Sequence, residues 1–346
     1  MITPSDFQKV LDTHLRRWPA MAPQDILKLA YQSVFGPGHM IPDAASCRAY
    51  LAEEWNTAKG ERFWEPIGGG LARFHLGAPQ PAEAEISLLS SLFIRTANMA
   101  HGSREELEAV LSTVSPALLP PDVLSQYQAQ GCPAVHHSAA YNAAYAPHYR
   151  VVAQEYACYF PVLLAVSQAL ERQETVLISI DGQCGSGKST LAAVLQDVFG
   201  GNLYHMDDFY LPFPQRQPGW RQLPAGNMDL ARFHSEVLEP IRSGQTVSYR
   251  PWDCSSGDYA PARKILPAQL HIIEGSYSQH PTLCGTYTLK VFLTCSTEER
   301  LRRLKLREGD ISGFLSTWIP LENLYHETYG IPSPSTITIN TENLIF

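Results

Sequence analysis

The sequence predicts an α/β domain with a mostly parallel sheet covered by helices, preceded by a mainly α-helical domain. Two observations lead to this prediction. Apolar residues recur at helical spacing up to about residue 173, whereas from residue 174 short β-rich runs alternate with helical patterns. A chain of 346 residues is long enough for two domains, and 45% hydrophobic with 17% charged residues is typical of globular proteins. We therefore expect a helical domain of unknown function at 1–173 and the α/β domain at 174–346.

Helix signals occur throughout the first half of the chain. Ser5 followed by Gln8 resembles a capping box. Pro23 suits the first turn of a helix, and Ser103 is a candidate N-cap. Together with the spacing of the apolar residues, these signals predict helices over about 5–17, 24–35, 86–101, from 103 onward, and 149–172.

The second half contains short runs rich in β-branched residues. The predicted strands cover 176–181, 202–206, 270–273, 288–293 and 336–339. Helical patterns lie between most of these runs. Strands that alternate with helices form parallel sheets with helices on both faces, and we expect that arrangement here.

Charge and composition argue against several classes of protein. With 26 Lys and Arg against 34 Asp and Glu, the formal net charge is −8, which argues against a nucleic-acid partner. No apolar run approaches the roughly 18 residues of a membrane span, and the first residues do not resemble a secretory signal. The seven cysteines are scattered without a C-x-x-C pair, so a reducing, cytoplasmic location is the simpler interpretation.

The most specific motif is a glycine-rich loop between a predicted strand and a predicted helix. It reads Gly182-Gln183-Cys184-Gly185-Ser186-Gly187-Lys188-Ser189 and fits G-x-x-x-x-G-K-[ST]. Glycines let successive backbone N–H groups converge on an anion, and the helix N-terminus adds a partial positive charge.

Each polar side chain of this loop has an expected role. Lys188 would reach the β- and γ-phosphates, the Ser189 hydroxyl would bind Mg²⁺, and Thr190 would be a further cofactor contact in the first helical turn. We therefore predict a nucleoside triphosphate site, for ATP or GTP with Mg²⁺. The alternative is a glycine-rich turn that binds nothing.

Carboxylates follow two of the predicted strands. Asp207 and Asp208 come directly after the second strand, and Glu274 ends the third and precedes a glycine. The carboxyl ends of parallel strands face the ligand crevice, so these groups should lie near the glycine-rich loop. Phosphoryl transfer to a hydroxyl needs a carboxylate base and carboxylates that hold Mg²⁺, which predicts Asp207 as the base and Asp208 and Glu274 as metal ligands. A solvated turn, a helix cap or a plain surface position are the alternatives.

A basic helix is predicted after the fourth strand. Arg300, Arg303 and Arg307 fall on one face of the segment 297–307. Guanidinium groups in a row could stabilise the charge on the transferred phosphoryl group, and we assign this role to Arg303 and Arg307. The alternative is a solvated helix face whose arginines pair with Glu298 and Glu299.

These motifs in this order resemble the uridine kinase/phosphoribulokinase branch of the P-loop kinases over about residues 174–330. The segments that carry the resemblance are the loop 182–189, Met206–Tyr210, Asn227–Asp229, Tyr249–Asp253, Ile272–Gly275 and the helix Arg300–Arg307. The resemblance implies a P-loop kinase domain behind an extra N-terminal helical domain. It also implies that Asp207 is the base toward a sugar hydroxyl.

The resemblance further implies an acceptor pocket. Its residues would be Asp207, Tyr210, Asp229, which would bind a ribose diol, Tyr249, Trp252 and Asp253. The sequence departs from the family after Arg307, where the longer arginine-bearing lid is missing. Asp208 also replaces a usual serine, and 211–226 is an insert rich in Pro and Arg.

We therefore predict an ATP-dependent kinase that transfers the γ-phosphoryl group to a hydroxyl of a nucleoside, a sugar or a related metabolite. One alternative is a nucleotide-driven switch that acts on a partner through the helical half. Another is a helical half that is an independent enzyme. The expected partner is a small-molecule acceptor, with no nucleic acid and no membrane, and a homodimer is left open.

The helical half holds seven of the twelve histidines, at positions 14, 39, 75, 101, 136, 137 and 148. Their spacing matches no metal signature, and no cysteine accompanies them. A structural role in capping and packing is the favoured interpretation. A ligand or metal site, or contacts that complete the acceptor pocket, are the alternatives.

Overall fold

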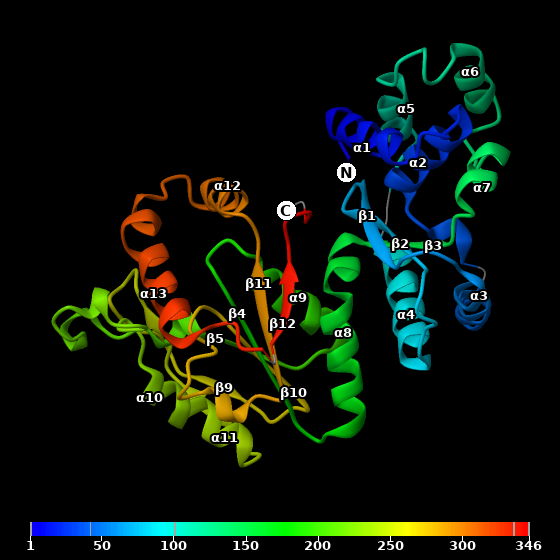
Figure 1. Ribbon diagram of the computed structural model, residues 1–346. Coiled ribbons are helices and arrows are strands. Elements are labelled where there is room, and N and C mark those ends of the chain that lie inside the picture. Colours follow the sequence, from blue (N-terminus) through cyan, green and yellow to red (C-terminus); the bar gives the residue numbers. More distant parts are fainter. Residues whose placement is uncertain (1, 42, 100–101, 335, 345–346) are drawn as a thin grey trace. The chain divides into compact units, whose positions relative to one another are not determined.

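A computed structural model describes residues 2–41, 43–99, 102–334 and 336–344 (Figure 1). The chain forms two compact units, one up to Phe160 and one from Pro161. The division falls inside the helix α8 (Gln154–Arg172), and the predicted boundary at 173 follows the last residue of that helix. None of the helices in these ranges is long and apolar enough to cross a membrane.

The first unit is mainly helical and also contains a small antiparallel sheet in the order β1-β2-β3. Its strands are β1 (Phe63–Gly68), β2 (Leu71–His75) and β3 (Tyr149–Ala153). Its helices are α1 (Pro4–Arg17), α2 (Pro23–Phe35), η1 (Gly38–Met40), α3 (Ala44–Thr57), α4 (Glu83–Met99), α5 (Arg104–Ser112), α6 (Pro121–Ala129) and α7 (Ala139–Tyr145).

Two sequence predictions for this unit are wrong in detail. The helix expected from residue 149 begins at Gln154, because Tyr149–Ala153 forms the strand β3 beside β2. In α1 the N-cap is Thr3, whose hydroxyl accepts a hydrogen bond from the backbone N–H of Asp6. The N-cap Ser103 of α5 is confirmed, whereas the helix end expected at His101 lies outside the described residues.

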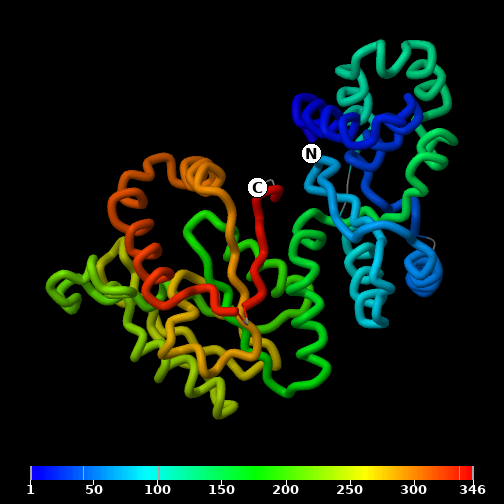
Figure 2. Tube along the Cα trace, in the orientation of Figure 1, coloured from blue at the N-terminus to red at the C-terminus, as the bar shows by residue number. Residues whose placement is uncertain are grey.

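The second unit is built on a parallel five-stranded sheet in the order β12-β11-β4-β10-β5 (Figure 1). Its strands are β4 (Val176–Gly182), β5 (Asn202–His205), β10 (Leu270–Glu274), β11 (Leu289–Thr294) and β12 (Ile337–Asn340). The five predicted strands are therefore confirmed to within one or two residues at each end. Figure 2 follows the chain to β12 (red), which pairs in parallel with β11 (orange).

Helices and short ribbons cover this sheet. The helices are α9 (Lys188–Phe199), η2 (Met206–Phe209), η3 (Phe213–Gln215), η4 (Trp220–Gln222), α10 (Leu230–Phe233), η5 (His234–Leu238), α11 (Glu239–Arg242), η6 (Cys284–Thr286), α12 (Thr297–Glu308), η7 (Phe314–Trp318) and α13 (Ile319–Tyr329). The ribbons pair β6 (Val247–Tyr249) with β9 (Arg263–Ile265) and β7 (Trp252–Asp253) with β8 (Asp258–Tyr259). On one face of the sheet, Leu177, Tyr204 and Ile273 pack with Phe233 and Tyr325 in a single apolar cluster.

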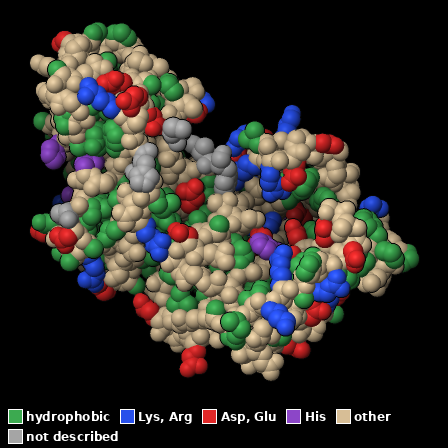
Figure 3. All heavy atoms as spheres, turned by 180° about the vertical axis from the view of Figure 1, so that it is seen from behind, with side chains coloured by type: hydrophobic (Ala, Val, Ile, Leu, Met, Phe, Trp, Pro, Cys, Tyr) green, Lys and Arg blue, Asp and Glu red, His purple; other side chains and the backbone are tan. Residues whose placement is uncertain are grey.

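The strand register brings the polar strand ends together. Glu274 lies beside His205 on one side and Ile180 on the other, so β4, β5 and β10 end at the same edge. The glycine-rich loop leaves β4 at this edge and leads into α9. The fold thus gathers the candidate site at the carboxyl ends of three neighbouring strands. On the face shown in Figure 3, basic and acidic side chains are interspersed.

Candidate active site

A cavity of about 680 Å³ opens at the carboxyl ends of the strands. Among the predicted site residues, it is lined by Cys184, Gly185, Gly187, Lys188, Ser189, Thr190, Asp207, Tyr210, Glu274, Arg303 and Arg307. The predicted site residues outside its lining are Gly182, Gln183, Ser186, Asp208, Asp229, Tyr249, Trp252 and Asp253. The volume is in the range of small-molecule sites in proteins.

The phosphate loop, residues 182–189, curls with positive φ angles at Gly185 (78°) and Gly187 (96°). A side chain at Gly185 would also bring its Cβ within 2.9 Å of the Arg300 carbonyl oxygen, so the loop needs glycine there. The Lys188 ammonium donates to the carbonyl oxygens of Gly182 (2.7 Å) and Gln183 (3.2 Å). The loop therefore holds a positive charge beside its own N–H groups, as an anion site requires.

A hydroxyl and a carboxylate face each other next to this loop. The Ser189 hydroxyl lies 3.3 and 3.4 Å from the two carboxylate oxygens of Glu274. Oxygen donors of this kind suit Mg²⁺, which takes one or two protein ligands and completes its shell with phosphate oxygens and water. Among the described residues, no group of three or more His, Cys, Asp or Glu side chains could hold a metal ion, and Ser189 and Glu274 are a pair of oxygen donors that line the cavity together.

His205 is a neighbour of this pair that sequence reasoning did not identify. Its Nδ1 lies 2.8 Å from a Glu274 carboxylate oxygen. This hydrogen bond raises the pKa of His205 above its ordinary value, against the opposing effect of burial. His205 therefore orients the Glu274 carboxylate from the strand next to it.

Asp207 and Asp208 are adjacent in sequence but have different surroundings, because the 3₁₀ turn η2 points them apart. Asp207 faces the cavity and accepts a hydrogen bond from the Tyr210 hydroxyl (2.9 Å). The surrounding protein raises the pKa of Asp207, and burial raises that of Tyr210 well above its usual value. A carboxylate with a raised pKa in a cleft is a candidate general base.

Asp208 instead belongs to a structural ion pair. Its carboxylate accepts hydrogen bonds from Arg263 (2.6 Å) and from the Tyr249 hydroxyl (2.9 Å), and it does not line the cavity. The structure therefore does not bring Asp208 to the expected metal position beside Ser189 and Glu274. Tyr249, expected in the acceptor pocket, is committed to the same ion pair.

The remaining residues predicted for the acceptor pocket have local structural contacts. Asp229 caps α10 by accepting the backbone N–H of Arg232 (3.0 Å). The Trp252 ring packs edge-on against Tyr259, with 5.1 Å between the ring centroids. Asp253 closes a turn by accepting from the backbone and side chain of Ser255. The structure does not bring these three side chains to the cavity lining.

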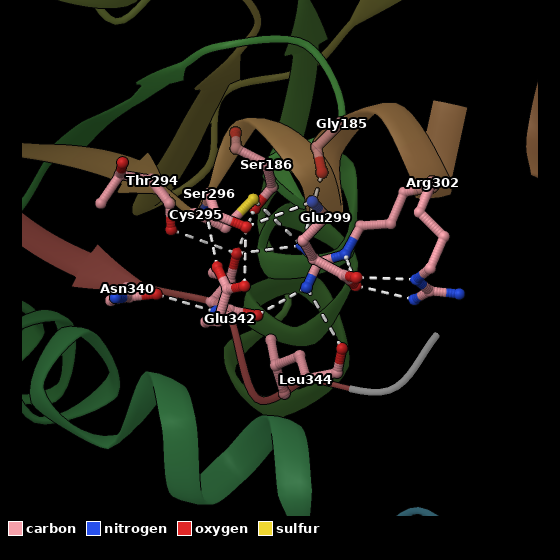
Figure 4. A network of polar contacts seen from close by, with 12 residues as sticks. Gly185, Ser186, Thr294, Cys295, Ser296, Glu299, Arg302, Asn340, Glu342 and Leu344 are labelled. Carbon is pink, nitrogen blue, oxygen red and sulfur yellow. Dashed lines mark hydrogen bonds and ion pairs between the residues drawn. The ribbon is translucent and has the colours of Figure 1, made fainter. Parts of the chain in front are cut away.

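The two arginines of α12 that were predicted to bind a phosphoryl group have different surroundings, and Figure 4 shows the polar network around Glu299 on this helix. Arg303 is buried, and its guanidinium donates to Glu299 (2.7 Å) and to the carbonyl oxygens of Thr341 (2.6 Å) and Gly185 (3.4 Å). It thus holds the back of the phosphate loop and does not present its guanidinium to a phosphoryl group. Arg307 lines the cavity with an exposed side chain that pairs with Glu308 (2.7 Å), so its contact with a phosphoryl group stays a prediction.

The cavity wall includes further polar and aromatic groups that the motifs did not predict. They are Ser276, Tyr277, Arg302, Glu308, Phe314, Trp318 and Glu322. Glu322 accepts a hydrogen bond from the backbone N–H of Cys184 (2.9 Å), although the two residues are 138 positions apart. No local motif marks such a residue. Burial raises the pKa of the Cys184 thiol to about 12, so this cysteine stays protonated and unreactive.

The histidines of the first unit take part in hydrogen-bond networks. Asp25 accepts from His137 Nδ1 (2.8 Å), and His137 Nε2 lies 2.7 Å from the Tyr149 hydroxyl. Glu65 lies 3.0 Å from His75 Nε2. Burial lowers the pKa of His137 to about 4, so the imidazole is neutral at physiological pH. These contacts favour the structural interpretation of the two histidines.

No protein-family model matches the chain, and none of the curated proteins matches it. Solved structures do align with about half of it. A possible uridine kinase from Bacillus stearothermophilus is 15% identical, covers 51% of this chain and 98% of its own, and has a TM-score of 0.40. D-glycerate 3-kinase from Cryptococcus neoformans is 16% identical over 54% of this chain and 96% of its own, with a TM-score of 0.39. A gluconokinase from Sinorhizobium meliloti is 16% identical, covers 49% of this chain and 84% of its own, and has a TM-score of 0.29.

These values describe likeness of fold. The second unit has a P-loop kinase-like fold, with a parallel sheet, a phosphate loop between β4 and α9, and a carboxylate at the end of β10. Because the TM-scores are below 0.5, the proposals below depend on the side chains of this chain alone.

Proposed function

We propose that the second unit is a Mg²⁺- and ATP-dependent kinase that transfers the γ-phosphoryl group to a hydroxyl of a nucleoside, a sugar or a related metabolite. The observation that carries this proposal is that one cavity contains the Asp207 carboxylate, the Lys188 ammonium and the Ser189–Glu274 pair. A kinase needs a base for the acceptor, a cation for the phosphates and donors for the metal. Asp207 would be the base, Lys188 the cation, and the Ser189–Glu274 pair the metal donors.

The residues divide the work of phosphoryl transfer between them. Lys188 leaves the carbonyl oxygens that it now contacts and binds the phosphate oxygens, together with the N–H groups of the loop. Ser189 and Glu274 would hold Mg²⁺, which neutralises charge on the β- and γ-phosphates. Arg307, at the cavity wall, would stabilise the charge on the transferred group.

Asp207 carries the proton transfer. Its Oδ1 accepts the Tyr210 hydroxyl, and we find no partner for Oδ2 within the described ranges of the chain. Oδ2 would accept the proton of the acceptor hydroxyl as the acceptor oxygen bonds to the γ-phosphorus. The bond from that phosphorus to the bridging oxygen of ADP breaks in the same step. Each proton and electron pair is thereby accounted for by groups in the cavity.

The test is a screen for acceptor-dependent ADP release. Full-length protein with MgATP is assayed against nucleosides, sugars, sugar acids and polyols, and the phosphorylated product is identified by mass spectrometry. Lys188→Ala should abolish turnover with the acceptor that is found. Lys264→Ala is the matched control, because this lysine is exposed and lies outside the cavity lining, and it should keep wild-type turnover.

Two outcomes would contradict the proposal. ADP release at the same rate with every compound would indicate the nucleotide-driven switch. Failure of calorimetry to detect MgATP or MgGTP binding at millimolar concentration would remove the nucleotide site itself.

A further inference from the structure

The helix α13 is fastened to the phosphate loop by two consecutive side chains. Glu322, only 5% exposed, accepts from the Cys184 backbone N–H through Oε2 (2.9 Å) and from the Ser276 hydroxyl through Oε1 (2.5 Å). The next residue, Asn323, accepts from the side-chain amide of Gln183 (3.1 Å). The end of β10 and the loop after β4 are therefore tied to one helix.

The Glu322 carboxylate accepts a hydrogen bond from the Cys184 backbone N–H, and an anionic ligand bound in the loop would accept from the same N–H. Backbone N–H groups of such a loop bind phosphate oxygens, and a carboxylate oxygen is the same kind of anionic acceptor. Glu322 also lines the cavity together with Lys188 and Ser189. A polyphosphate in the loop would bring like charge close to this carboxylate and compete for the Cys184 N–H.

The same end of α13 also reaches the acceptor side of the cavity, one helical turn before Glu322. Trp318 is the N-cap residue of α13, and its ring centroid lies 5.8 Å from that of Tyr210 and 6.4 Å from that of Trp220. Tyr210 in turn donates to Asp207. The path from the Cys184 N–H to the Asp207 carboxylate thus passes through α13 and two aromatic rings.

We propose that Glu322 is a positioning residue that couples the nucleotide to the acceptor side of the site. The triphosphate displaces Glu322 from the Cys184 N–H, α13 shifts, and Trp318 changes its packing on Tyr210, which orients the base Asp207. This inference rests on the proposed function, because it assumes a nucleotide in the loop.

The experiment uses the full chain, MgATP as the probe and tryptophan fluorescence as the signal. The contribution of Trp318 is obtained by subtracting the spectrum of Trp318→Phe, and MgATP affinity is measured separately by calorimetry. In the wild type we expect the Trp318 signal to change when MgATP binds. Glu322→Ala should bind MgATP and lose that change.

Glu322→Gln keeps the size of the side chain and one oxygen that accepts from the Cys184 N–H, but it removes the charge. Its NH₂ group cannot accept from the Ser276 hydroxyl and can only donate to it. The variant should bind MgATP about threefold more tightly or better, because a like charge no longer opposes the phosphates. Glu327→Gln, on the exposed face of α13, is the matched control and should behave as the wild type in both measurements.

The outcomes separate the two proposals. MgATP binding without a change in the Trp318 signal overturns the coupling and leaves the kinase proposal standing. The same holds if Glu322→Gln and Glu327→Gln give equal affinities and equal signals. If the wild type does not bind MgATP, the kinase proposal fails and the coupling fails with it.

Discussion

Each unit contains an aspartate that accepts hydrogen bonds from neighbouring side chains, yet Asp25 and Asp207 differ in how many of their oxygens are engaged. In the first unit, Asp25 is fully buried and accepts four hydrogen bonds, from His137, from the backbone and hydroxyl of Ser138, and from the backbone of Ala22. In the second unit, Asp207 accepts one, from Tyr210, and faces a cavity. A carboxylate whose oxygens are all engaged inside the protein stabilises the fold, whereas one with an oxygen toward a cavity is available for chemistry.

The pKa values of Asp25 and Asp207 also differ, and the number of hydrogen bonds that each carboxylate accepts explains the difference. Burial alone would raise the pKa of Asp25, but the hydrogen bonds from His137, Ser138 and Ala22 outweigh it and lower the pKa to about 2. For Asp207 burial dominates, and one hydrogen bond does not compensate, so its pKa is raised. The same residue type therefore has a lowered pKa in the first unit and a raised pKa in the second, and the raised pKa is what the proposed base would need.

The largest expected effect is on turnover in the second unit. Asp207→Asn removes the group that accepts the proton but keeps its shape, so the rate should fall about 10²- to 10⁴-fold while MgATP still binds. Steady-state rates and calorimetry on the same preparation measure both quantities. Wild-type turnover in this variant would reject Asp207 as the base.

The corresponding change in the first unit should affect stability and not turnover. Asp25→Asn replaces one acceptor oxygen by an amide that cannot accept, so the donors that met this oxygen lose their partner and the unit should lose about 3 kcal/mol of stability. Hydrogen exchange of peptides from residues 2–99 measures this loss. Asp43→Asn, at the exposed N-cap of α3, is the control and should cost about 1 kcal/mol or less.

A fall in turnover of Asp25→Asn with unchanged hydrogen exchange would contradict the comparison. It would place a group needed for turnover in the first unit and favour the alternative in which that unit completes the acceptor pocket.

Acid should weaken the first unit through its buried histidines. Burial lowers the pKa values of His14 and His137 to about 4, whereas an unfolded histidine titrates near 6.5. As the pH falls, the histidines of the unfolded state therefore take up protons before those of the folded state, and this favours unfolding. The free energy of unfolding is highest above about pH 6.5 and decreases as the pH falls toward about 4. We expect a loss of about 4 kcal/mol between about pH 7 and 5, about half from each histidine, seen as faster hydrogen exchange after correction for the intrinsic rate.

His137→Gln should make this pH dependence shallower, because one of the two groups no longer titrates. An equal slope in the variant and the wild type would show that His137 is not the source of the acid sensitivity.

The smallest expected effect concerns the pH at which the proposed kinase loses activity. Tyr210→Phe removes the hydrogen bond that lowers the Asp207 pKa, so the carboxylate should protonate at higher pH. The acid limb of the pH–rate profile should move up by about one pH unit or less. A shift toward lower pH, or none, would contradict the role given to Tyr210.

The sequence predicted the two units unequally, for physical reasons. The central strands β4 and β10 of the second unit are buried on both faces and stand out as short apolar runs next to glycine loops. In the first unit, four of the five residues of β3 are buried, so the run lacks the alternation of a half-buried strand and reads as part of the apolar helix that follows. The hairpin of β1 and β2 was not predicted at all.

The candidate site was predictable where neighbours along the chain carry the chemistry. The phosphate loop, Asp207 and Glu274 follow strands directly, and a parallel sheet brings such residues together. Sequence could not distinguish Asp207 from Asp208, or Arg303 from Arg307, because the choice depends on Arg263 and Thr341, which lie elsewhere in the chain. The contact of Glu322 with the loop depends on tertiary structure in the same way.

The network of Figure 4 has a practical consequence for how the protein is prepared. The Thr341 hydroxyl donates to the carbonyl oxygen of Ser186, 155 residues away, while Arg303 binds the carbonyl oxygens of Thr341 and Leu344. A shortened version that stops at β12 would contain every recognisable motif but would lose the contacts of residues 341–344 with Ser186 and Arg303. If such a truncated protein bound its ligand more weakly, the cause would be a less well-ordered phosphate loop and not the loss of a ligand contact. Protein prepared for inhibitor screening or crystallisation should therefore retain residues 341–344.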